Sequence, residues 1–534
     1  MKIVTSTQMH AAESLARGAG VSESEMMEAA GAAVAQEILE LPSQGEILIL
    51  CGPGNNGGDG FVVARCLREN GRKVTGVVAI PTSKLKGEPL KQYRKTVESD
   101  VPIFGTDEDG YDDALNPDRD YDVVVDAILG TGQKGRPKDD IADLIEAADT
   151  FAAFVISIDV PSGINPDTGL SSGIHVNADQ TVCIGAPKPF LFQNDGLEAA
   201  GLWTVADIGI GEHFLEVCSR AEICDTPWVY EKLPGRNINS HKRNSGVVLV
   251  VAGSNMYPGA ATLAALGAIR QGAGLVTVAS IPFVLEGVRN HLPECPLLHL
   301  PDENGQMAES AVEIISEYAK RCDSIVIGPG IGRSDQINAF LERLFLNVES
   351  RLVIDADALN SLPDLKNRPR GSAVLTPHMG EAARLLLTSS EEVMQNRFST
   401  VREIVEKYGC AALLKGPFTL VCAPEQDVIV NSTGNALLAT AGTGDVLSGV
   451  IGALLAMGAN PFDAATIGAF CHGASADLLA KRFDGLLGAT AWDIAESLPA
   501  ARQDNLANFL NELVEDESRW EEELAAYELE EEEI

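Results

Sequence analysis

Two glycine-rich segments, far apart in the chain, each carry an aspartate and mark the places where chemistry is expected. Residues 51–60 read CGPGNNGGDG and follow an apolar run, and residues 440–445 read TAGTGD and precede another. Glycine lets the backbone approach a ligand closely, and free N–H groups at a helix N-terminus attract anions. We therefore expect two active sites on one chain, both of which handle phosphate-bearing molecules.

Oxygen-bearing side chains gather around the first segment. Asn56 belongs to it, Asp126 and Asp159 lie near the ends of two further apolar runs, and Ser162 follows Asp159 closely. Amide, carboxylate and hydroxyl oxygens suit alkali or alkaline-earth cations. Catalytic groups of open parallel sheets collect at strand ends, so Asp159 could act as an acid or a base. The alternative is that Asp126 and Asp159 only cap the turns that follow them.

The second segment predicts phosphoryl transfer. Glycine N–H groups at a helix start could bind the phosphate, and Asp445 could then remove a proton from an attacking hydroxyl. Upstream, Lys415 sits in a strand–turn–strand pattern and could meet phosphate as a point charge. His378 opens a helix, where it is either a substrate contact or a polar residue of the helix start; spacing favours the second role. The sequence has no GxxxxGK[ST] motif, which excludes a P-loop enzyme.

The elements that position these residues follow from the hydrophobic pattern. In the first half, helical spacing is expected at 22–39 and 60–70, and strands at 46–51, 73–80, 121–129 and 154–160. After a polar stretch at 226–242, strands are expected at 246–252, 274–280, 324–328, 352–355, 373–376, 411–414, 419–422 and 428–430, and helices at 260–272, 446–457 and 467–481. Strands that alternate with helices predict parallel sheets, which bind ligands at the carboxyl ends of their strands.

Composition narrows the function classes. The 534 residues carry a formal net charge of −37, which argues against a nucleic-acid backbone as partner. The ten cysteines form no CxxC pair, so zinc and redox motifs have no support. No signal peptide or membrane-spanning apolar run is evident, and we expect a cytoplasmic protein with reduced thiols. The length suggests about three or four domains, or fewer if they are large α/β units. We expect two such units, at 1–225 and 229–502, and an acidic, solvated tail at 503–534.

The first domain resembles the NAD(P)HX epimerase family. The resemblance rests on residues 27–31, 52–60, 126–136 and 159–163 and covers about residues 1–225. It implies a Rossmann-like parallel sheet sandwich, a potassium ion held by Asn56, Asp126 and Ser162, and Asp159 as the acid/base group. The residues implied to contact the damaged nucleotide are Asn55, Asn56, Gly57, Gly58, Asp59, Gly130, Thr131, Gly132, Gln133, Lys134, Gly135, Arg136 and Asp159.

The second domain resembles the ADP-dependent NAD(P)HX dehydratases, and its GTGD before a helix is typical of the wider ribokinase-like α/β proteins. The resemblance spans roughly residues 229–500 and rests on the segments at 253–261, 328–332, 355–360, 376–381, 415–419, 431–435 and 441–445. One departure is Ala441, where a glycine is usual. The implied contacts to the hydrated nucleotide are Ala261, Gly330, His378 and Asp445, and those to the adenine nucleotide are Lys415, Gly416, Pro417, Phe418, Thr419 and Gly444.

Together the two resemblances imply a bifunctional enzyme of nicotinamide nucleotide repair. The first domain would interconvert R- and S-NAD(P)HX, and the second would dehydrate the S epimer with ADP and Mg²⁺, Asp445 being the base. The expected partners are NADHX or NADPHX and ADP, with no nucleic acid and no membrane, and we expect a homo-oligomer. Two alternatives are a small-molecule kinase with the same GTGD segment and a non-catalytic first domain on an active dehydratase. The sequence leaves open which of NADHX and NADPHX is preferred.

Overall fold

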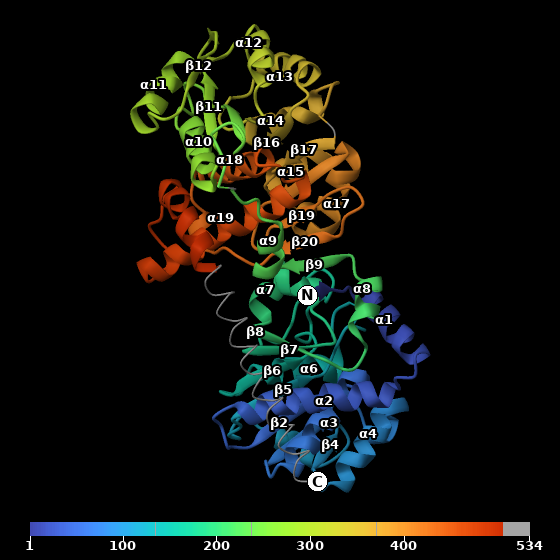
Figure 1. Ribbon diagram of the computed structural model, residues 1–534. Coiled ribbons are helices and arrows are strands. Elements are labelled where there is room, and N and C mark those ends of the chain that lie inside the picture. Colours follow the sequence, from blue (N-terminus) through green and yellow to red (C-terminus); the bar gives the residue numbers. More distant parts are fainter. Residues whose placement is uncertain (134, 237, 370, 506–534) are drawn as a thin grey trace, which may run out of the picture. The chain divides into compact units, whose positions relative to one another are not determined.

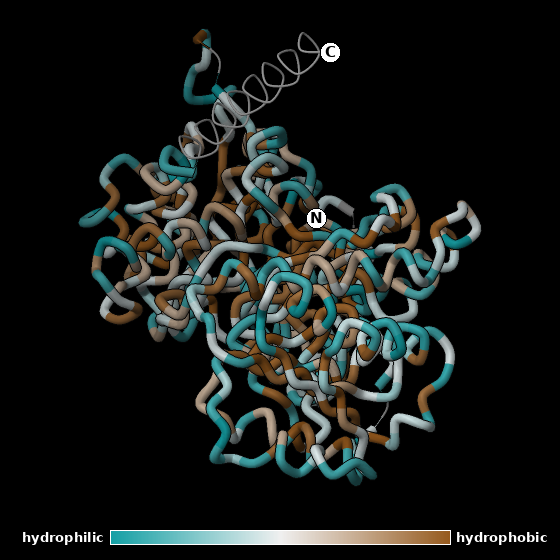
Figure 2. Tube along the Cα trace, turned by 90° about the horizontal axis from the view of Figure 1, so that it is seen from below, coloured by the Kyte–Doolittle hydropathy of each residue, from teal (hydrophilic) through white to brown (hydrophobic). Residues whose placement is uncertain are grey.

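A computed structural model describes residues 1–133, 135–236, 238–369 and 371–505 (Figure 1). Most of the acidic tail expected at 503–534 lies outside the described residues. The chain divides into two compact units, Met1–Glu222 and a second that begins at Ile223. In Figure 2 hydrophobic segments gather in the interior and hydrophilic ones occupy the outer loops. None of the described helices is long and apolar enough to cross a bilayer.

The first unit is built on a parallel sheet with the strand order β4-β3-β2-β5-β6-β7-β8. Counted along the chain, this is the order of a dinucleotide-binding Rossmann sheet with a seventh strand added. Its topological switch point lies between β2 and β5, where such sheets bind ligands. The strands are β2 (Ile47–Cys51), β3 (Val74–Val78), β4 (Ile103–Gly105), β5 (Val123–Ala127), β6 (Phe154–Ile158), β7 (Gln180–Ile184) and β8 (Leu202–Ala206).

Helices cover both faces of this sheet because alternate strand residues point to opposite sides. Ile47 and Ile49 of β2 share a buried cluster with Phe61 of α3. Leu48 and Leu50 share the opposite cluster with Leu144 of α6. The helices are α1 (Ser6–Gly18), α2 (Glu23–Glu40), α3 (Asn55–Glu69), α4 (Gly87–Glu98), α5 (Gly110–Ala114), α6 (Asp139–Ala148), α7 (Gly196–Ala199) and α8 (Glu212–Cys218), with 3₁₀ turns at Thr82–Lys84 and Pro189–Phe192.

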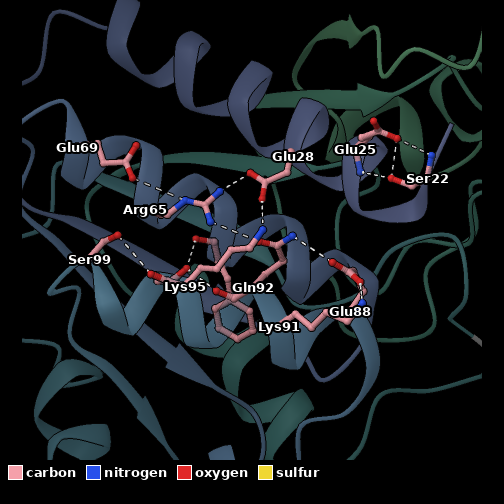
Figure 3. A network of polar contacts seen from close by, with 12 residues as sticks. Ser22, Glu25, Glu28, Arg65, Glu69, Glu88, Lys91, Gln92, Lys95 and Ser99 are labelled. Atoms are coloured by element: carbon pink, nitrogen blue, oxygen red, sulfur yellow. Dashed lines mark hydrogen bonds and ion pairs between the residues drawn. The ribbon is translucent and has the colours of Figure 1, made fainter.

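A polar network ties α2, α3 and α4 together on one side of the unit (Figure 3). The Glu28 carboxylate of α2 accepts hydrogen bonds from Arg65 of α3 and from Lys95 of α4, the latter at 2.7 Å. Arg65 also donates to Gln92 of α4 at 3.4 Å. A single exposed ion pair contributes little to stability, so the network acts through its several links together. These links connect α3, whose N-terminus carries the first glycine segment, to α2 and α4.

The two ends of the first unit meet. The short strand β1 (Lys2–Ile3) pairs antiparallel with β9 (Ala221–Cys224), in the register Lys2 to Glu222 and Ile3 to Ala221. The Lys2 ammonium lies 2.5 Å from the Glu222 carboxylate, and Ser219 Oγ donates to the Ile3 carbonyl at 2.7 Å. Residues about 220 positions apart in the chain therefore close the unit.

Within the second unit, neighbouring strands follow the order β12-β11-β10-β15-β16-β17-β18-β19-β20. The pairs from β12 to β18 are parallel, and β18, β19 and β20 pair antiparallel. The switch point falls between β10 and β15. The strands are β10 (Val247–Val251), β11 (Leu275–Ser280), β12 (Leu297–His299), β15 (Ser324–Ile327), β16 (Arg351–Ile354), β17 (Gly371–Leu375), β18 (Cys410–Leu414), β19 (Leu420–Cys422) and β20 (Val428–Asn431), beside a small ribbon of β13 (Asp302–Glu303) and β14 (Gln306–Met307).

Close packing between two helices places the second glycine segment. A Cβ on Gly449 of α18 would lie 1.9 Å from the Ala264 carbonyl oxygen of α10, and one on Gly267 would lie 2.3 Å from that of Val446. Only glycine permits this approach. The helices of the unit are α9 (Thr226–Lys232), α10 (Ala260–Gln271), α11 (Pro282–His291), α12 (Ala311–Ala319), α13 (Asp335–Asn347), α14 (Ala356–Ser361), α15 (Met379–Leu386), α16 (Ser390–Gln395), α17 (Arg397–Tyr408), α18 (Thr443–Ala456) and α19 (Pro461–Phe483), with 3₁₀ turns at Leu362–Asp364 and Ala436–Leu438. Residues 491–505 are also helical.

The predicted parallel sheets are confirmed, except that β18, β19 and β20 pair antiparallel, and several element boundaries differ. Helix α3 begins at Asn55, so the segment expected to be a turn before residue 60 is already its first turn. Helix α18 likewise begins at Thr443 within the GTGD segment. Residues 226–232 form α9 in the stretch read as unpatterned, because Asp225 caps it by accepting from the Trp228 N–H at 3.0 Å. Strands β7 and β8 were not anticipated.

Candidate active sites

A cavity of about 390 Å³ opens at the carboxyl edge of the first sheet. It lies where the switch point predicts, beside the loops that follow β2, β5 and β6. Predicted site residues in its lining are Asn55, Asn56, Asp59, Gly130, Thr131, Gly132, Gln133 and Asp159. The structure therefore brings together most of the residues that the sequence singled out in this half.

The start of α3 is built to hold an anion. Gly54 is its N-cap and has an extended backbone. The first N–H groups of any helix lack partners within the helix and carry the positive end of its dipole. Gly57 allows this turn to lie against the strand end, because a Cβ there would meet the Gly52 carbonyl oxygen at 2.0 Å. A Cβ on Gly58 would meet the Met27 sulfur at 2.7 Å. Gly57 and Gly58 thus shape the helix start and do not line the cavity.

The three residues predicted to hold a cation lie together. Asp126 is fully buried and accepts hydrogen bonds from Ser162 Oγ at 2.5 Å, from the Ser162 N–H at 2.8 Å and from Ser157 Oγ at 2.8 Å. Asn56 donates through Nδ2 to the Leu129 carbonyl at 3.0 Å, and Ser162 Oγ accepts from the Leu129 N–H at 2.8 Å. Burial raises the pKa of Asp126 against these bonds. A cation would favour the charged form, so this oxygen set fits a hard ion.

Asp159 is held in a strained backbone by a lysine that the sequence analysis missed. Its φ is +71°, a region that aspartate tolerates better than most residues. Its Oδ1 accepts from the ammonium of Lys188, which is fully buried, and from the Ile184 N–H at 3.2 Å. Lys188 also donates to the Ile184 carbonyl at 2.7 Å. A lysine between two prolines directly after the apolar run that forms β7 was the signal that could have revealed it.

A second carboxyl group, that of Asp59, lies in the same cavity. Burial raises the pKa of the half-buried Asp59 well above its usual range, the negative charges of Asp159 and Glu13 raise it further, and Lys188 opposes them. Asp59 therefore favours its protonated form more than an exposed aspartate does, while the carboxylate of Asp159 is paired with Lys188. A carboxyl group in such an environment is a candidate for acid/base chemistry.

Some residues of the first site lie elsewhere or were not foreseen. Gly135 and Arg136 are not among the residues that line the cavity, and Lys134 lies outside the described residues. Besides Lys188, the lining includes Met9, His10 and Glu13 of α1. The helical pattern of residues 6–18 was readable, but nothing in it indicated that this helix would reach a strand edge.

In the second unit the loops after neighbouring strands meet at the switch point. The Gly253 N–H after β10 donates to the Pro329 carbonyl after β15 at 2.8 Å. Gly330 has φ +61°, and a Cβ there would lie 2.7 Å from Tyr257 Cβ and 2.9 Å from Ala260 Cβ. Ala261 follows in the first turn of α10 and is fully buried. Its side chain packs inside, so a contact to substrate would have to come from its backbone.

Lys415 is the cation at the centre of the second site. Its Nζ lies 2.9 Å from Asp355 Oδ1 and 3.8 Å from Glu381 Oε2. Burial lowers the pKa of Lys415, but Asp355 and Glu381 outweigh it and raise the pKa overall. A Cβ on Gly444 would lie 3.5 Å from the ammonium nitrogen, so Lys415 faces the GTGD turn directly. Asp355 and Glu381 were not among the predicted site residues.

Asp445, in the first turn of α18, has the protonation behaviour of a general base. Burial, the largest effect, and the negative charge of Asp355 raise its pKa, Lys415 opposes them, and the net pKa is about 7. Asp357 and Glu381 contribute smaller increases. An acid or base works best with a pKa near the operating pH. The carboxylates around Lys415 therefore help to hold the pKa of Asp445 in the range that suits proton transfer.

His378 has the structural role that its spacing favours. It is the N-cap of α15, where its Nδ1 accepts from the Gly380 N–H at 3.0 Å and the Glu381 N–H at 3.3 Å. The Glu381 carboxylate accepts in turn from the His378 N–H at 2.8 Å. Because Nδ1 is an acceptor, the neutral ring carries its proton on Nε2, on a side chain that is largely exposed. Nε2 also lies 3.5 Å from Glu381 Oε1, so a ligand there would share this nitrogen with that carboxylate.

The turn between β18 and β19 carries the remaining predicted contacts. Gly416 and Pro417 are exposed. Phe418 has φ +48°, and its carbonyl accepts from the buried Arg397 guanidinium at 3.0 Å. Thr419 Oγ1 donates to the Gly416 carbonyl at 3.2 Å. The buried Arg397 thus holds the Phe418 backbone in its positive-φ conformation, while Gly416 and Pro417 are exposed to solvent. Among the described residues, His, Cys, Asp and Glu form no group of three or more suited to a metal.

Comparison with known proteins matches both halves of the chain. The family model described as NAD(P)H-hydrate dehydratase matches residues 248–500, and that described as YjeF-related protein N-terminus matches residues 23–190. A bifunctional NAD(P)H-hydrate repair enzyme of Coxiella burnetii is 37% identical over 89% of this chain and 94% of its own. A protein of the same name from Escherichia coli is 34% identical, over 90% of this chain and 89% of its own. The ADP/ATP-dependent NAD(P)H-hydrate dehydratase of Bacillus subtilis, crystallised with ATP and Mg²⁺, is 27% identical over 53% of this chain and 98% of its own, with a TM-score of 0.46.

Proposed function

The chain belongs to the family of bifunctional NAD(P)H-hydrate repair enzymes, and we propose how its two units divide the work. The first unit interconverts the R and S epimers of NADHX and NADPHX. The second dehydrates the S epimer with ADP, which returns NAD(P)H, AMP and phosphate. The division explains the fusion, because a dehydratase specific for one epimer recovers all of the damaged cofactor only if the other epimer is converted.

In the first site, protein groups bind the nucleotide and move protons at its hydrated ring. The N–H groups at the start of α3 and the loop at 130–133 bind the phosphates. Asp159, held by Lys188, serves as the acid/base group at the C6 hydroxyl, and Asp59 lies in the same cavity. Asn56, Asp126 and Ser162 hold potassium, which would supply positive charge beside the bound nucleotide. The support is that these three residues share one hydrogen-bonded cluster.

In the second site, Asp445 accepts the proton of the C6 hydroxyl as that oxygen attacks the terminal phosphoryl group of ADP. Lys415 and the N–H groups of the GTGD turn hold the phosphoryl oxygens. Gly416, Pro417, Phe418 and Thr419 line the adenine nucleotide, and Ala261, Gly330 and His378 contact the hydrated nucleotide. Mg²⁺ bound with ADP would neutralise phosphate charge. Loss of phosphate from C6, together with a proton from C5, then restores the C5–C6 double bond of the nicotinamide ring.

One observation carries this assignment. Asp445, whose pKa is raised to about 7, stands at the start of a glycine-led helix that the Lys415 ammonium faces across Gly444. A base, a cation and free backbone N–H groups in one turn are the parts that in-line phosphoryl transfer to a hydroxyl needs.

The testing experiment follows NADH absorbance from a mixed R/S NADHX preparation, with ADP, ATP or neither, in the presence of K⁺ and Mg²⁺. Complete recovery with ADP is expected. Recovery that stops at the S fraction would make the first unit a non-catalytic scaffold. No recovery with either nucleotide, together with phosphorylation of a stable alcohol, would indicate a small-molecule kinase.

We also propose a homo-oligomeric state and a cytoplasmic location. The location is supported by the thiols, since all ten cysteines, which lie in the described residues, are free. Light scattering coupled to gel filtration tests the first proposal, and a mass of one chain of 56.5 kDa would refute it.

A further inference from the structure

A buried carboxylate that the chemistry above does not use stands behind the phosphate end of the second site. Asp355 follows β16, and 1% of its surface is exposed. Its Oδ1 accepts hydrogen bonds from Lys415 Nζ at 2.9 Å and from Thr376 Oγ1 at 2.8 Å. Its Oδ2 accepts one from Ser448 Oγ at 2.6 Å. One side chain thus joins the ends of β16, β17 and β18 to helix α18.

The local backbone does not explain this placement. Asp355 is the N-cap of α14, a position where aspartate usually accepts from the N–H groups of the first turn. It makes no such bond. The next residue, Ala356, has φ +51°, which is unfavourable for an L-residue. A Cβ on Gly328 would lie 1.9 Å from the Asp355 carbonyl oxygen, so the chain also fits tightly here. The carboxylate therefore accepts hydrogen bonds from residues of other elements and leaves the first turn of α14 without a side-chain cap.

Two partners of Asp355 converge on the same glycine. The Lys415 ammonium faces Gly444, at 3.5 Å from the position of a Cβ there. Ser448 Oγ, which donates to Asp355, also lies 3.1 Å from the Gly444 carbonyl oxygen. Asp355 is too deeply buried to contact a bound nucleotide itself. Its influence on the reaction must therefore pass through these partners.

We propose that Asp355 is a positioning residue for dehydration, which holds Lys415 against the first turn of α18 so that the ammonium group, Gly444 and Asp445 face the transferred phosphoryl group together. The inference deepens the proposed dehydratase activity and rests on it. Dehydration of S-NADHX with ADP by the unmodified protein is measured first; failure at that point would count against the proposed function, whereas the variants below test only Asp355.

The first test compares Asp355→Ala and Asp355→Asn in the full chain. Misplacement of catalytic groups by about 1 Å can cost about 100-fold in rate, and we expect a loss of that order in kcat for Asp355→Ala. Asp355→Asn should lose less, because its amide oxygen can still accept from Lys415 Nζ and Thr376 Oγ1, and only the bond from Ser448 Oγ loses its acceptor oxygen. Epimerisation of R-NADHX by the same preparations should stay within twofold. Asp323→Asn is the matched control: Asp323 accepts from the Val247 N–H at 2.8 Å at the opposite edge of the same sheet, and both activities should be kept.

The second readout is one that a merely structural role would not move. The charged groups that face Asp445 are Asp355, Lys415, Asp357 and Glu381, and Asp355 has the largest effect among them. Removing its negative charge should shift the acid limb of kcat/KM for dehydration to lower pH in Asp355→Asn, by about one unit. An unmoved limb, or a dehydration rate within twofold of the unmodified protein, would overturn the proposal.

A third variant keeps the test decisive if Asp355→Asn loses both activities through misfolding. Ser448→Ala leaves the carboxylate and Lys415 in place and removes only the link to α18. We expect about a tenfold loss of dehydration with epimerisation kept, as for other residues that orient catalytic groups. Dehydration at the unmodified rate would show that Asp355 does not act through α18.

Discussion

The raised pKa of Asp445 predicts a steep pH dependence of dehydration. A base works in its deprotonated form, so activity should rise with pH through the pKa of about 7. At pH 6 about one eleventh of Asp445 is ionised and at pH 8 about ten elevenths, so kcat/KM should increase about tenfold over this interval. An aspartate with its usual pKa near 4 would be ionised throughout, and the same interval would be flat.

The structure also gives the sign of a perturbation. Lys415 opposes the rise in the pKa of Asp445, whereas Asp355 supports it. Lys415→Met should therefore move the acid limb of kcat/KM to higher pH, opposite to the shift expected for Asp355→Asn. The rate will fall as well, since the phosphoryl group loses a cation, but the position of the limb can be read at any rate. Opposite shifts in two variants cannot come from a general loss of structure.

The assay follows NADH absorbance from S-NADHX with saturating ADP, K⁺ and Mg²⁺, at substrate concentrations well below KM and from pH 5.5 to 9. Asp445→Asn should lose about 10²- to 10⁴-fold and leave a flat profile. Epimerisation by Asp445→Asn should be unchanged. A profile of the unmodified protein that is flat from pH 6 to 8, or an acid limb in Lys415→Met that moves to lower pH, would refute the electrostatic reasoning.

Three further predictions concern both sites. Lys188→Met leaves the buried Asp159 without its cation, and loss of one partner of a buried ion pair costs about 3–5 kcal/mol of stability. Urea unfolding followed by circular dichroism should show the first unit unfolding at a lower urea concentration, and the variant should lose epimerisation but keep dehydration. Unaltered unfolding would contradict the pairing. Replacing K⁺ by Li⁺ should slow epimerisation and leave Ser162→Ala, already slow, unaffected; equal rates of the unmodified protein in both salts would argue against the cation site. Ala441→Gly should change kcat for dehydration less than twofold, because Ala441 is exposed and Gly442 and Gly444 provide the turn; a gain of tenfold would show that the methyl group narrows it.

The sequence predicts the sheets well because their central strands are continuous apolar runs, and those of β2 and β10 are buried at every position. The glycine segments were found because a close approach leaves glycine as the only choice, as at Gly57 and Gly449. Their exact structure was less accessible: Asn55 looks like a turn residue, yet it starts α3, because Gly57 lets the helix begin directly on the strand end.

The sequence did not reveal the site residues Lys188 and Asp355, which act through ion pairs with other residues. Lys188 and Asp355 lie far in sequence from their partners Asp159 and Lys415, at separations of 29 and 60 residues. No local pattern marks such pairs, because the strand order that brings them together is a property of the whole sheet. Asp355 lies in the segment 355–360, which contributes to the family resemblance, but an aspartate directly before a helix is also typical of an ordinary N-cap. Its role becomes visible only when the three donors are seen around one carboxylate.

The closure of the first unit by β1 and β9 bears on how the protein is made. Residues 2 and 3 are translated some 220 residues before their partners at 221 and 222. At about 5–20 residues per second, this strand waits on the order of ten seconds or more for its place. The parallel strands from β2 to β8 can assemble in the meantime, since their partners are already available. The pairing of Lys2 with Glu222 becomes possible only when synthesis has reached the first residues of the second unit. The first unit is therefore completed as synthesis of the second begins.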